Sequence, residues 1–188
     1  MIEIISAQKQ HIPTIKKLAD YLWPKAFASI LSTEQIDYMM EMMYSQASIE
    51  KQMDEGHQFA IAQKDNVDIG YVSYETNHNN SHKTKIHKLY ISPEYQRHGI
   101  GKLMVDYVAG QALKANNNSL FLNVNKFNTG AIGFYKKHNF VLTKKEVIDI
   151  GNGFIMDDFV FELAWNQSTI DDETPQHIYN TSSKWQIK

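Results

Sequence analysis

Residues 87–102 read HKLYISPEYQRHGIGK, and this stretch carries most of the information about the fold. It begins with the composition of a β-strand, a Ser-Pro pair ends the strand, and two glycines precede an amphipathic helical pattern. Backbone N–H groups and the helix dipole at such a junction favour an anion. Gly99 and Gly101 let phosphate oxygens approach the main chain, and Arg97, the only arginine of the chain, suits bidentate phosphate contact. We therefore predict a phosphate site in this turn.

Three phosphate-binding motifs compete for this turn, and two of them do not fit. A Walker A loop needs Ser or Thr after its lysine, whereas Lys102 is followed by Leu103. A Rossmann fingerprint needs a third glycine at position 104, which is a methionine. The remaining pattern runs from Gln96 to Gly101 and has the form Q/R-x-x-G-x-G/A. It resembles the pyrophosphate-binding motif of the GNAT superfamily of acyl-CoA-dependent N-acetyltransferases.

The sequence downstream supports the same resemblance. Residues 128–140, NTGAIGFYKKHNF, are similar to the N-x-x-A-x-x-x-Y-x-K-x-G-F helix of that family. Asn139 stands where the family has a glycine, and because asparagine tolerates left-handed backbone angles, we still expect the helix to end there. The resemblance in order and spacing covers roughly residues 58–163.

Composition limits the other possibilities. The chain has 188 residues, 43% of them hydrophobic, no cysteine and a formal net charge of −2. It therefore lacks disulfides and thiolate zinc sites, and we expect no metal site. The charge argues against a nucleic-acid surface, and no apolar run approaches the ~20 residues that span a bilayer. Because the N-terminus does not fit a signal peptide, we expect a cytoplasmic protein without nucleic-acid or membrane partners.

The periodicity predicts an α/β protein with the order β-α-α-β-β-β-α-β-α-β-β. Strands are expected at 2–6, 59–62, 69–74, 85–91, 120–124, 141–150 and 154–163. Helices are expected at 12–23, 33–43 and 128–138, and a further helix is expected to begin at residue 100. The first helix is expected to end near Trp23-Pro24. The resemblance implies one GNAT-like domain over residues 1–165, with a mixed, mostly antiparallel twisted sheet of about six or seven strands. Its central strand pair is splayed and about four helices flank it, followed by a polar C-terminal extension over residues 166–188.

Acetyl-CoA is the co-substrate that the resemblance implies. Main-chain groups of Leu89, Tyr90 and Ile91 are expected to bind the pantetheine arm as an added half-strand and to polarise the thioester. The diphosphate is expected to lie against Arg97, His98, Gly99, Ile100, Gly101 and Lys102. Asn128 is expected to reach the coenzyme while capping its helix, and Lys137 either approaches the adenosine phosphate or is a solvated surface lysine.

Two residues are candidates for catalysis. Tyr135 resembles the family's general acid, which protonates the departing thiolate. Many members of the family place a glutamate on the central strand as base, but this strand has Lys85 and His87 instead. His87 is our candidate base because its pKa is near working pH, with Glu75 in reserve. Alternatively, the amine arrives neutral and no dedicated base exists.

The acceptor is less well defined. Residues 30–44 correspond to the variable wall of the acceptor cleft, and they combine Glu34, Asp37 and Glu41 with Tyr38, Met42 and Tyr44. Asp157 and Asp158 could add negative charge. The chain is similar to bacterial polyamine and small-amine acetyltransferases, so a small amine is the first hypothesis. A peptide or protein amine is the second, a non-catalytic acyl-CoA sensor is the third, and a homodimer is possible as in many family members.

Overall fold

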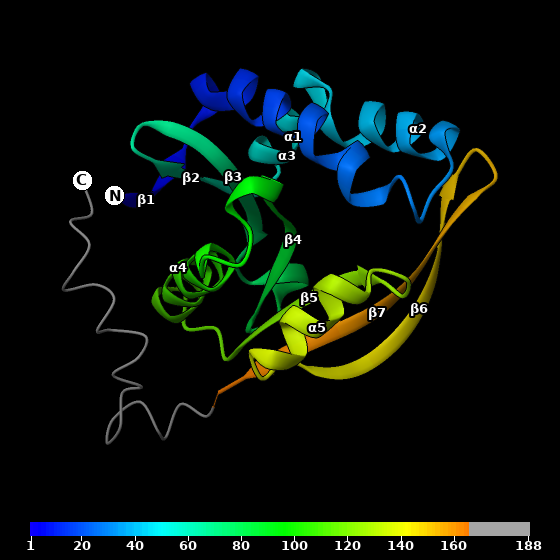
Figure 1. Cartoon of the computed structure of the whole chain (residues 1–188). Helices are drawn as coiled ribbons and strands as arrows, with labels where there is room; N and C mark the ends of the chain where they lie inside the picture. Colours follow the sequence, from blue (N-terminus) through cyan, green and yellow to red (C-terminus); the bar gives the residue numbers. More distant parts are fainter. Residues whose placement is uncertain (166–188) are drawn as a thin grey trace. The chain divides into compact units, whose positions relative to one another are not determined.

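The computed structural model describes residues 1–165, and the extension expected over 166–188 lies outside them. Within the described part, the strands form a seven-stranded mixed sheet in the order β1-β2-β3-β4-β5-β7-β6 (Figure 1). This confirms the expected α/β class. The strands are β1 Ile2–Ala7, β2 Gln58–Lys64, β3 Val67–Glu75, β4 Lys83–Ile91, β5 Ser119–Asn125, β6 Val141–Gly151 and β7 Phe154–Ala164. The helices are α1 Ile12–Phe27, α2 Thr33–Tyr44, α3 Gln46–Asp54, α4 Ile100–Lys114 and α5 Thr129–Lys137.

The chain divides into two compact units. The first contains Met1–Tyr74, Lys88–Gly101 and Asp149–Ile155, and the second contains Glu75–His87, Lys102–Ile148 and the chain from Met156 onward. The first unit holds β1, β2, nearly all of β3 and the helices α1, α2 and α3. The second holds β5, α5 and most of α4, β6 and β7.

In the first unit, β1 and β3 pair antiparallel on either side of β2. Helix α1 runs to Phe27, so the expectation that it ends near Pro24 was wrong. A proline removes only its own N–H, and the ring of Phe27 packs against Trp23 at a centroid distance of 4.3 Å. Both side chains are buried, so the apolar face continues past the proline.

Helix α3 was not expected, which is why the structure has one helix more than the sequence predicted. Ser45 caps it by accepting a hydrogen bond from the Ser48 N–H at 3.3 Å. Ile49 is its one buried side chain, so the helix lacks a detectable apolar period.

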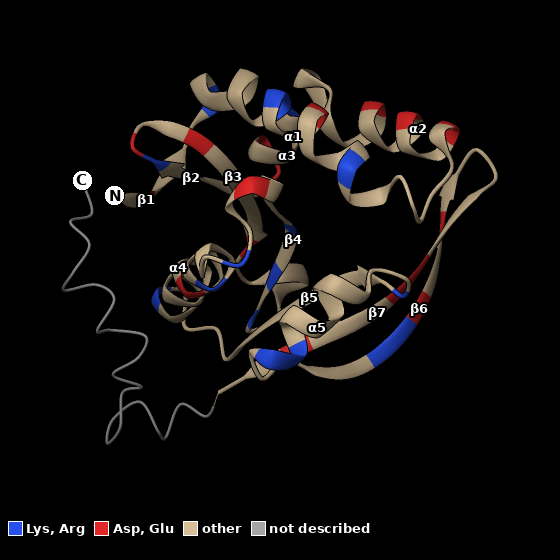
Figure 2. Ribbon diagram, viewed as in Figure 1, with Lys and Arg blue, Asp and Glu red and all other residues tan. Residues whose placement is uncertain are grey.

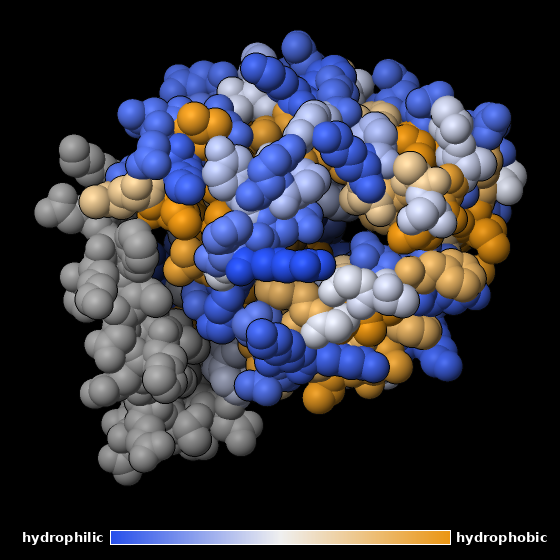
Figure 3. Space-filling view, viewed as in Figure 1, coloured by the Kyte–Doolittle hydropathy of each residue, from blue (hydrophilic) through white to orange (hydrophobic). Residues whose placement is uncertain are grey.

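Helix α2 begins as predicted, with the Ser32 hydroxyl accepting from the Gln35 N–H at 3.2 Å. Its three acidic residues, Glu34, Asp37 and Glu41, are exposed and lie along its outward side (Figure 2). Figure 3 shows mostly hydrophilic residues with scattered hydrophobic ones where α1 and α2 lie, and a mixture of both over the β6–β7 hairpin. None of the helices in residues 1–165 combines the length and the apolar character that crossing a bilayer requires.

In the second unit, β5 has different partners on its two sides. Its parallel ladder with β4 joins Lys83–Ile86 to Ser119–Leu122. Its antiparallel ladder with β7 continues to Asn125, which pairs with Asp158. The ladder with β4 therefore stops before either strand ends, as expected for a splayed central pair.

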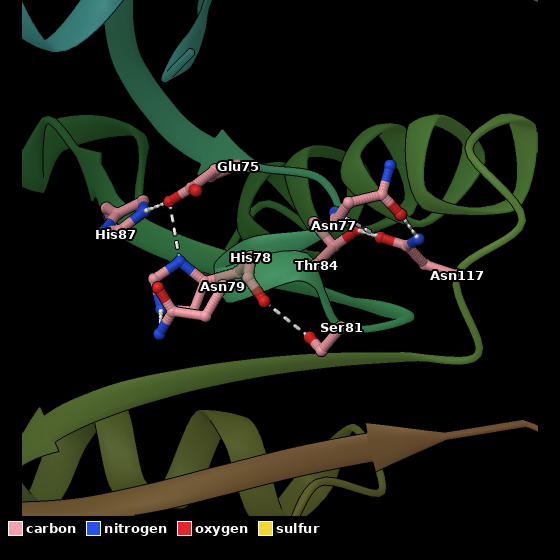
Figure 4. Close-up of polar contacts among 8 residues, drawn as sticks. All are labelled: Glu75, Asn77, His78, Asn79, Ser81, Thr84, His87 and Asn117. Carbon is pink, nitrogen blue, oxygen red and sulfur yellow. Dashed lines mark hydrogen bonds and ion pairs between the residues drawn. The ribbon is translucent and has the colours of Figure 1, made fainter. Parts of the chain in front are cut away.

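A buried asparagine holds the loop between β3 and β4. The Asn117 side chain is 1% exposed, and its oxygen accepts from the Thr84 hydroxyl at 2.7 Å and from the Asn77 N–H at 2.9 Å (Figure 4). Its amide nitrogen donates to the Asn77 side chain at 2.5 Å and to the Ala115 carbonyl at 3.2 Å. One amide therefore fixes the loop that follows Glu75.

Replacing Asn117 with alanine should lower the free energy of unfolding by about 2–4 kcal/mol, because the buried Thr84 hydroxyl loses its partner and the Asn77 loop loses its anchor. Urea unfolding at neutral pH measures this. Asn118→Ala is the matched control, since Asn118 is exposed and contributes its backbone to the bonds with His82 and Trp165. Equal losses in the two variants would contradict the anchoring role.

Candidate active site

The segment Leu89–Ile91 lies against β3 at an unusually close approach. A Cβ placed at Gly70 would come within 2.5 Å of the Tyr90 carbonyl oxygen and 3.1 Å of the Ile91 Cα. The Ser92 N–H donates to the Ile69 carbonyl at 2.8 Å, which fixes the end of β4. Glycine at position 70 is therefore required for the path that β4 takes at the three predicted coenzyme-binding residues.

The side chain of Tyr90 belongs to an aromatic cluster of the first unit. Its ring centroid lies 5.6 Å from Tyr71, 6.1 Å from Trp23 and 6.3 Å from Phe27. Tyr44 joins this cluster by accepting a hydrogen bond from the Trp23 indole at 2.7 Å. Burial raises the pKa of Tyr44 well above its usual range. Tyr44, proposed from the sequence as part of the acceptor wall, is therefore in the core.

The predicted phosphate turn has the local geometry for an anion. Arg97 and Gly99 have positive φ angles of 64° and 79°, and both are exposed together with His98. The space beside Gly99 is open, so its backbone angle, not crowding, is the reason for glycine. Helix α4 begins directly afterwards at the buried Ile100. Exposed main chain, a helix N-terminus and an arginine together fit a diphosphate.

Basic residues of the second unit gather near His138. Partial burial lowers the pKa of His138, and the charges of Lys102 and Lys137 lower it further, while Asp106 acts in the opposite direction. Lys102 also forms an ion pair with Asp106. Both lysines proposed from the sequence for phosphate contact therefore lower the pKa of the same imidazole.

Helix α5 carries two of the predicted residues. The Asn128 side chain accepts from the Ala131 N–H at 3.1 Å, which is the expected N-cap. Asn139 has a φ of 65°, so asparagine does replace the family's glycine in a left-handed position. Tyr135 is buried, and its ring lies 5.3 Å from Phe140 and 6.4 Å from Phe161.

Burial also raises the pKa of Tyr135 well above that of a free tyrosine. The phenol is therefore protonated at neutral pH. It can donate a hydrogen bond or a proton, and it does not act as a base.

The two candidate bases proposed from the sequence are joined in the structure. The Glu75 Oε2 atom lies 3.1 Å from the His87 Nε2 atom and 2.7 Å from the His78 Nδ1 atom (Figure 4). All three side chains are half-buried. Sequence reasoning missed His78, whose signal is its place three residues after Glu75. A carboxylate that holds an imidazole selects the tautomer and the orientation of its ring.

The remaining candidates for acceptor binding differ in their surroundings. Tyr38 donates to the Ile150 carbonyl at 2.8 Å and packs against Phe154, so its hydroxyl is engaged by the β6–β7 turn. Asp157 forms an ion pair with Lys126. Asp158, its neighbour on β7, is 6% exposed.

Comparisons with known proteins agree with the resemblance to the GNAT family. The sequence model of the acetyltransferase (GNAT) family matches residues 17–140. The chain is 40% identical over 67 residues to the peptidyl-lysine N-acetyltransferase YjaB of Salmonella typhimurium. Those 67 residues make up 35% of this chain and 43% of that protein. The chain thus matches less than half the length of this curated relative.

Two solved structures share the fold. The PaiA N-acetyltransferase from Thermoplasma acidophilum, in complex with coenzyme A, superposes with a TM-score of 0.73 at 23% identity, covering 88% of this chain and 99% of that one. A GCN5-related N-acetyltransferase from Rhodopseudomonas palustris has a TM-score of 0.73 at 16% identity, covering 87% and 95%. At such identities the likeness concerns the fold alone.

Replacing Gly70 with alanine should weaken coenzyme A binding at least tenfold, because the added Cβ would force β4 to shift at Tyr90. Overpacking of this kind should also lower stability by about 1–3 kcal/mol. Isothermal titration calorimetry with coenzyme A measures the affinity. Gly110→Ala in α4 is the matched control: nothing lies within 4 Å of its Cβ, and we expect unchanged binding with a gain of about 0.5–1 kcal/mol. Wild-type affinity in Gly70→Ala would refute the requirement.

Proposed function

Since this chain belongs to the GNAT acetyltransferase family, we propose that it transfers the acetyl group of acetyl-CoA to a primary amine, and that the acceptor is a small cationic amine such as a polyamine. The observation that carries the acceptor class is the charge of α2. This helix has three exposed acidic residues and no lysine or arginine. A polycation gains from such a surface, because several like charges attract it over a distance of about 10 Å.

In this proposal the acetyl donor is bound through the main chain. Leu89, Tyr90 and Ile91 offer backbone groups to the pantetheine amides, and the Leu89 and Tyr90 N–H groups polarise the thioester carbonyl. Residues 97–102 bind the diphosphate. Lys137 approaches the adenosine phosphate. Its charge lowers the pKa of His138, as does the charge of Lys102 in the diphosphate turn, and this supports the assignment.

The acceptor must lose a proton before it can react. An amine with a pKa of ~10.4 is neutral at pH 7 in about one molecule in 10³, a cost of about 4.6 kcal/mol. In our proposal His87 takes this proton, and Glu75 stabilises the imidazolium that forms, as its 3.1 Å contact with His87 supports. Glu75 is then a positioning residue and His87 the base.

The remaining steps follow from the placement of protons. The neutral amine attacks the thioester carbonyl carbon, and the C–N bond forms while the C–S bond breaks. Tyr135 gives its phenol proton to the departing sulfur, and the second proton released by the nitrogen restores the phenol. Because burial raises the pKa of Tyr135, this transfer is concerted with C–S cleavage instead of preceding it. His87 finally releases its proton to water.

Acetylation of a lysine side chain in a protein is the second candidate. The curated relative is named as a peptidyl-lysine acetyltransferase, which favours this acceptor over other peptide amines. A lysine side chain and a polyamine end share the primary alkylammonium group, so the chemistry above is the same for both.

Release of free coenzyme A thiol across a panel of acceptors tests the proposal. We expect saturable turnover on spermidine and butane-1,4-diamine, and a loss of at least tenfold in kcat for Tyr135→Phe with coenzyme A affinity unchanged. Turnover confined to lysine-containing peptides would select the second candidate. Coenzyme A binding without turnover on any amine would overturn the enzyme proposal in favour of a sensor.

A second set of variants tests the base. His87→Gln should lower kcat/KM at least tenfold for strongly basic amines. The loss should shrink for weakly basic amines such as trifluoroethylamine, which are already neutral at pH 7. Glu75→Gln should show the same trend with a smaller loss. His82→Gln, on an exposed side chain, is the control. An equal loss for all amines would exclude a proton-accepting role for His87.

A further inference from the structure

Asp157 and Asp158 are consecutive carboxylates on β7 with opposite surroundings. Asp157 is half-buried and paired with the Lys126 ammonium group. Asp158 is 94% shielded from solvent, and its Oδ1 atom has no hydrogen-bond partner among the described residues. A buried carboxylate oxygen in this condition is costly, because Oδ1 has lost water without gaining a donor from the described residues.

The other charged groups around Asp158 do not neutralise it. Pairing across the sheet places Asp158 opposite Asn125 and Val160 opposite Asn123, so these four residues share one face of the second unit. On the same face, Asn123 donates to the Glu146 carboxylate at 2.9 Å. Glu146 also forms an ion pair with Lys144, and both contacts lower its pKa, so it is ionised and already partnered.

The balance of charge around Asp158 is therefore negative. Burial, together with the charges of Asp157 and Glu146, raises the pKa of Asp158 to about 6. Lys85 on β4 acts in the opposite direction, but its influence is the smallest of the four. Lys85 instead lies over the Phe121 ring, 5.8 Å from its centroid.

We propose that Asp158, with Glu146 beside it, is a subsite for the primary alkylammonium group of the acceptor. This inference rests on the proposed function and names the residue that selects its acceptor. An ammonium group supplies the donor that Oδ1 lacks and the positive charge that the surrounding carboxylates favour. Asp158 faces away from the side chain of Asp157 because successive side chains of a strand alternate, so the two carboxylates are not interchangeable.

The position along β5 supports the assignment. Asn125, the partner of Asp158, lies beyond Leu122, where the ladder between β4 and β5 ends. In the proposed function the thioester is bound at Leu89 and Tyr90, and both residues also lie beyond the end of that ladder.

The isosteric variant Asp158→Asn tests the proposal, with Asp157→Asn as its matched control. In the presence of coenzyme A, calorimetric titration should give a Kd for butane-1,4-diamine, and for Nα-acetyl-lysine methylamide, at least tenfold higher in Asp158→Asn than in the wild type. Asp157→Asn should lie within twofold of the wild type. In turnover assays the KM of the amine should rise in Asp158→Asn, while the KM of acetyl-CoA does not change.

Stability supplies a readout that does not depend on the acceptor. A carboxyl whose pKa is raised from about 4 in the unfolded chain to about 6 in the native state destabilises the protein as pH rises through that interval. Asp158→Asn should therefore melt at a higher temperature than the wild type at pH 7.5 and at the same temperature near pH 4. A variant that is more stable yet binds amines less well is expected of a binding residue and not of a structural one.

The two proposals fail in different ways. Unchanged amine affinity in Asp158→Asn, in a protein that turns over amines, would overturn the subsite and leave the proposed function standing. Amine binding that depends on Asp158, without any turnover, would support the subsite and overturn the proposed function.

Discussion

The site depends on the point at which the parallel ladder between β4 and β5 ends. Hydrogen bonding joins Lys83–Ile86 to Ser119–Leu122, after which β5 continues with β7 alone. Main-chain groups that leave a ladder must find other partners, since an unpaired buried amide is costly. A ligand with its own amides can supply them by adding a short strand. In the proposed function, the register of one strand pair thus determines which residues of β4 are available for the coenzyme.

Much of this arrangement could be predicted from the sequence, because it depends on local patterns. The turn containing Arg97 and Gly99, the capping residues Ser32 and Asn128, and the left-handed Asn139 each follow from the chemistry of a few neighbouring residues. Helix α3 could not be predicted, since one buried side chain, Ile49, produces no periodicity. The continuation of α1 past Pro24 was missed because long-range burial of Phe27 outweighs one lost backbone donor.

The same division applies to the site. The sequence proposed Tyr135 and His87 as catalytic candidates, but it could not show that Glu75 contacts His87, because that pairing depends on how β3 and β4 are aligned. It also could not separate Asp157 from Asp158, which are identical in type and adjacent in position. Burial distinguishes them, and it raises the pKa of both Asp158 and Tyr135. It keeps the Tyr135 phenol protonated, and it leaves the Asp158 carboxyl with a proton that it releases near neutral pH.

The turns of this protein are built with asparagine more often than with glycine. Left-handed backbone angles occur at Asn66, Asn77, Asn79, Asn80, Asn116, Asn139 and Asn152. Asparagine is among the residues that heat degrades, because its side chain can be attacked by the next backbone nitrogen, and a following glycine offers the least steric resistance. Asn152-Gly153 is the one such pair in the sequence, and it forms the exposed turn between β6 and β7. Chemical ageing of the protein should therefore begin at this turn, next to the Ile150 carbonyl that Tyr38 of α2 contacts.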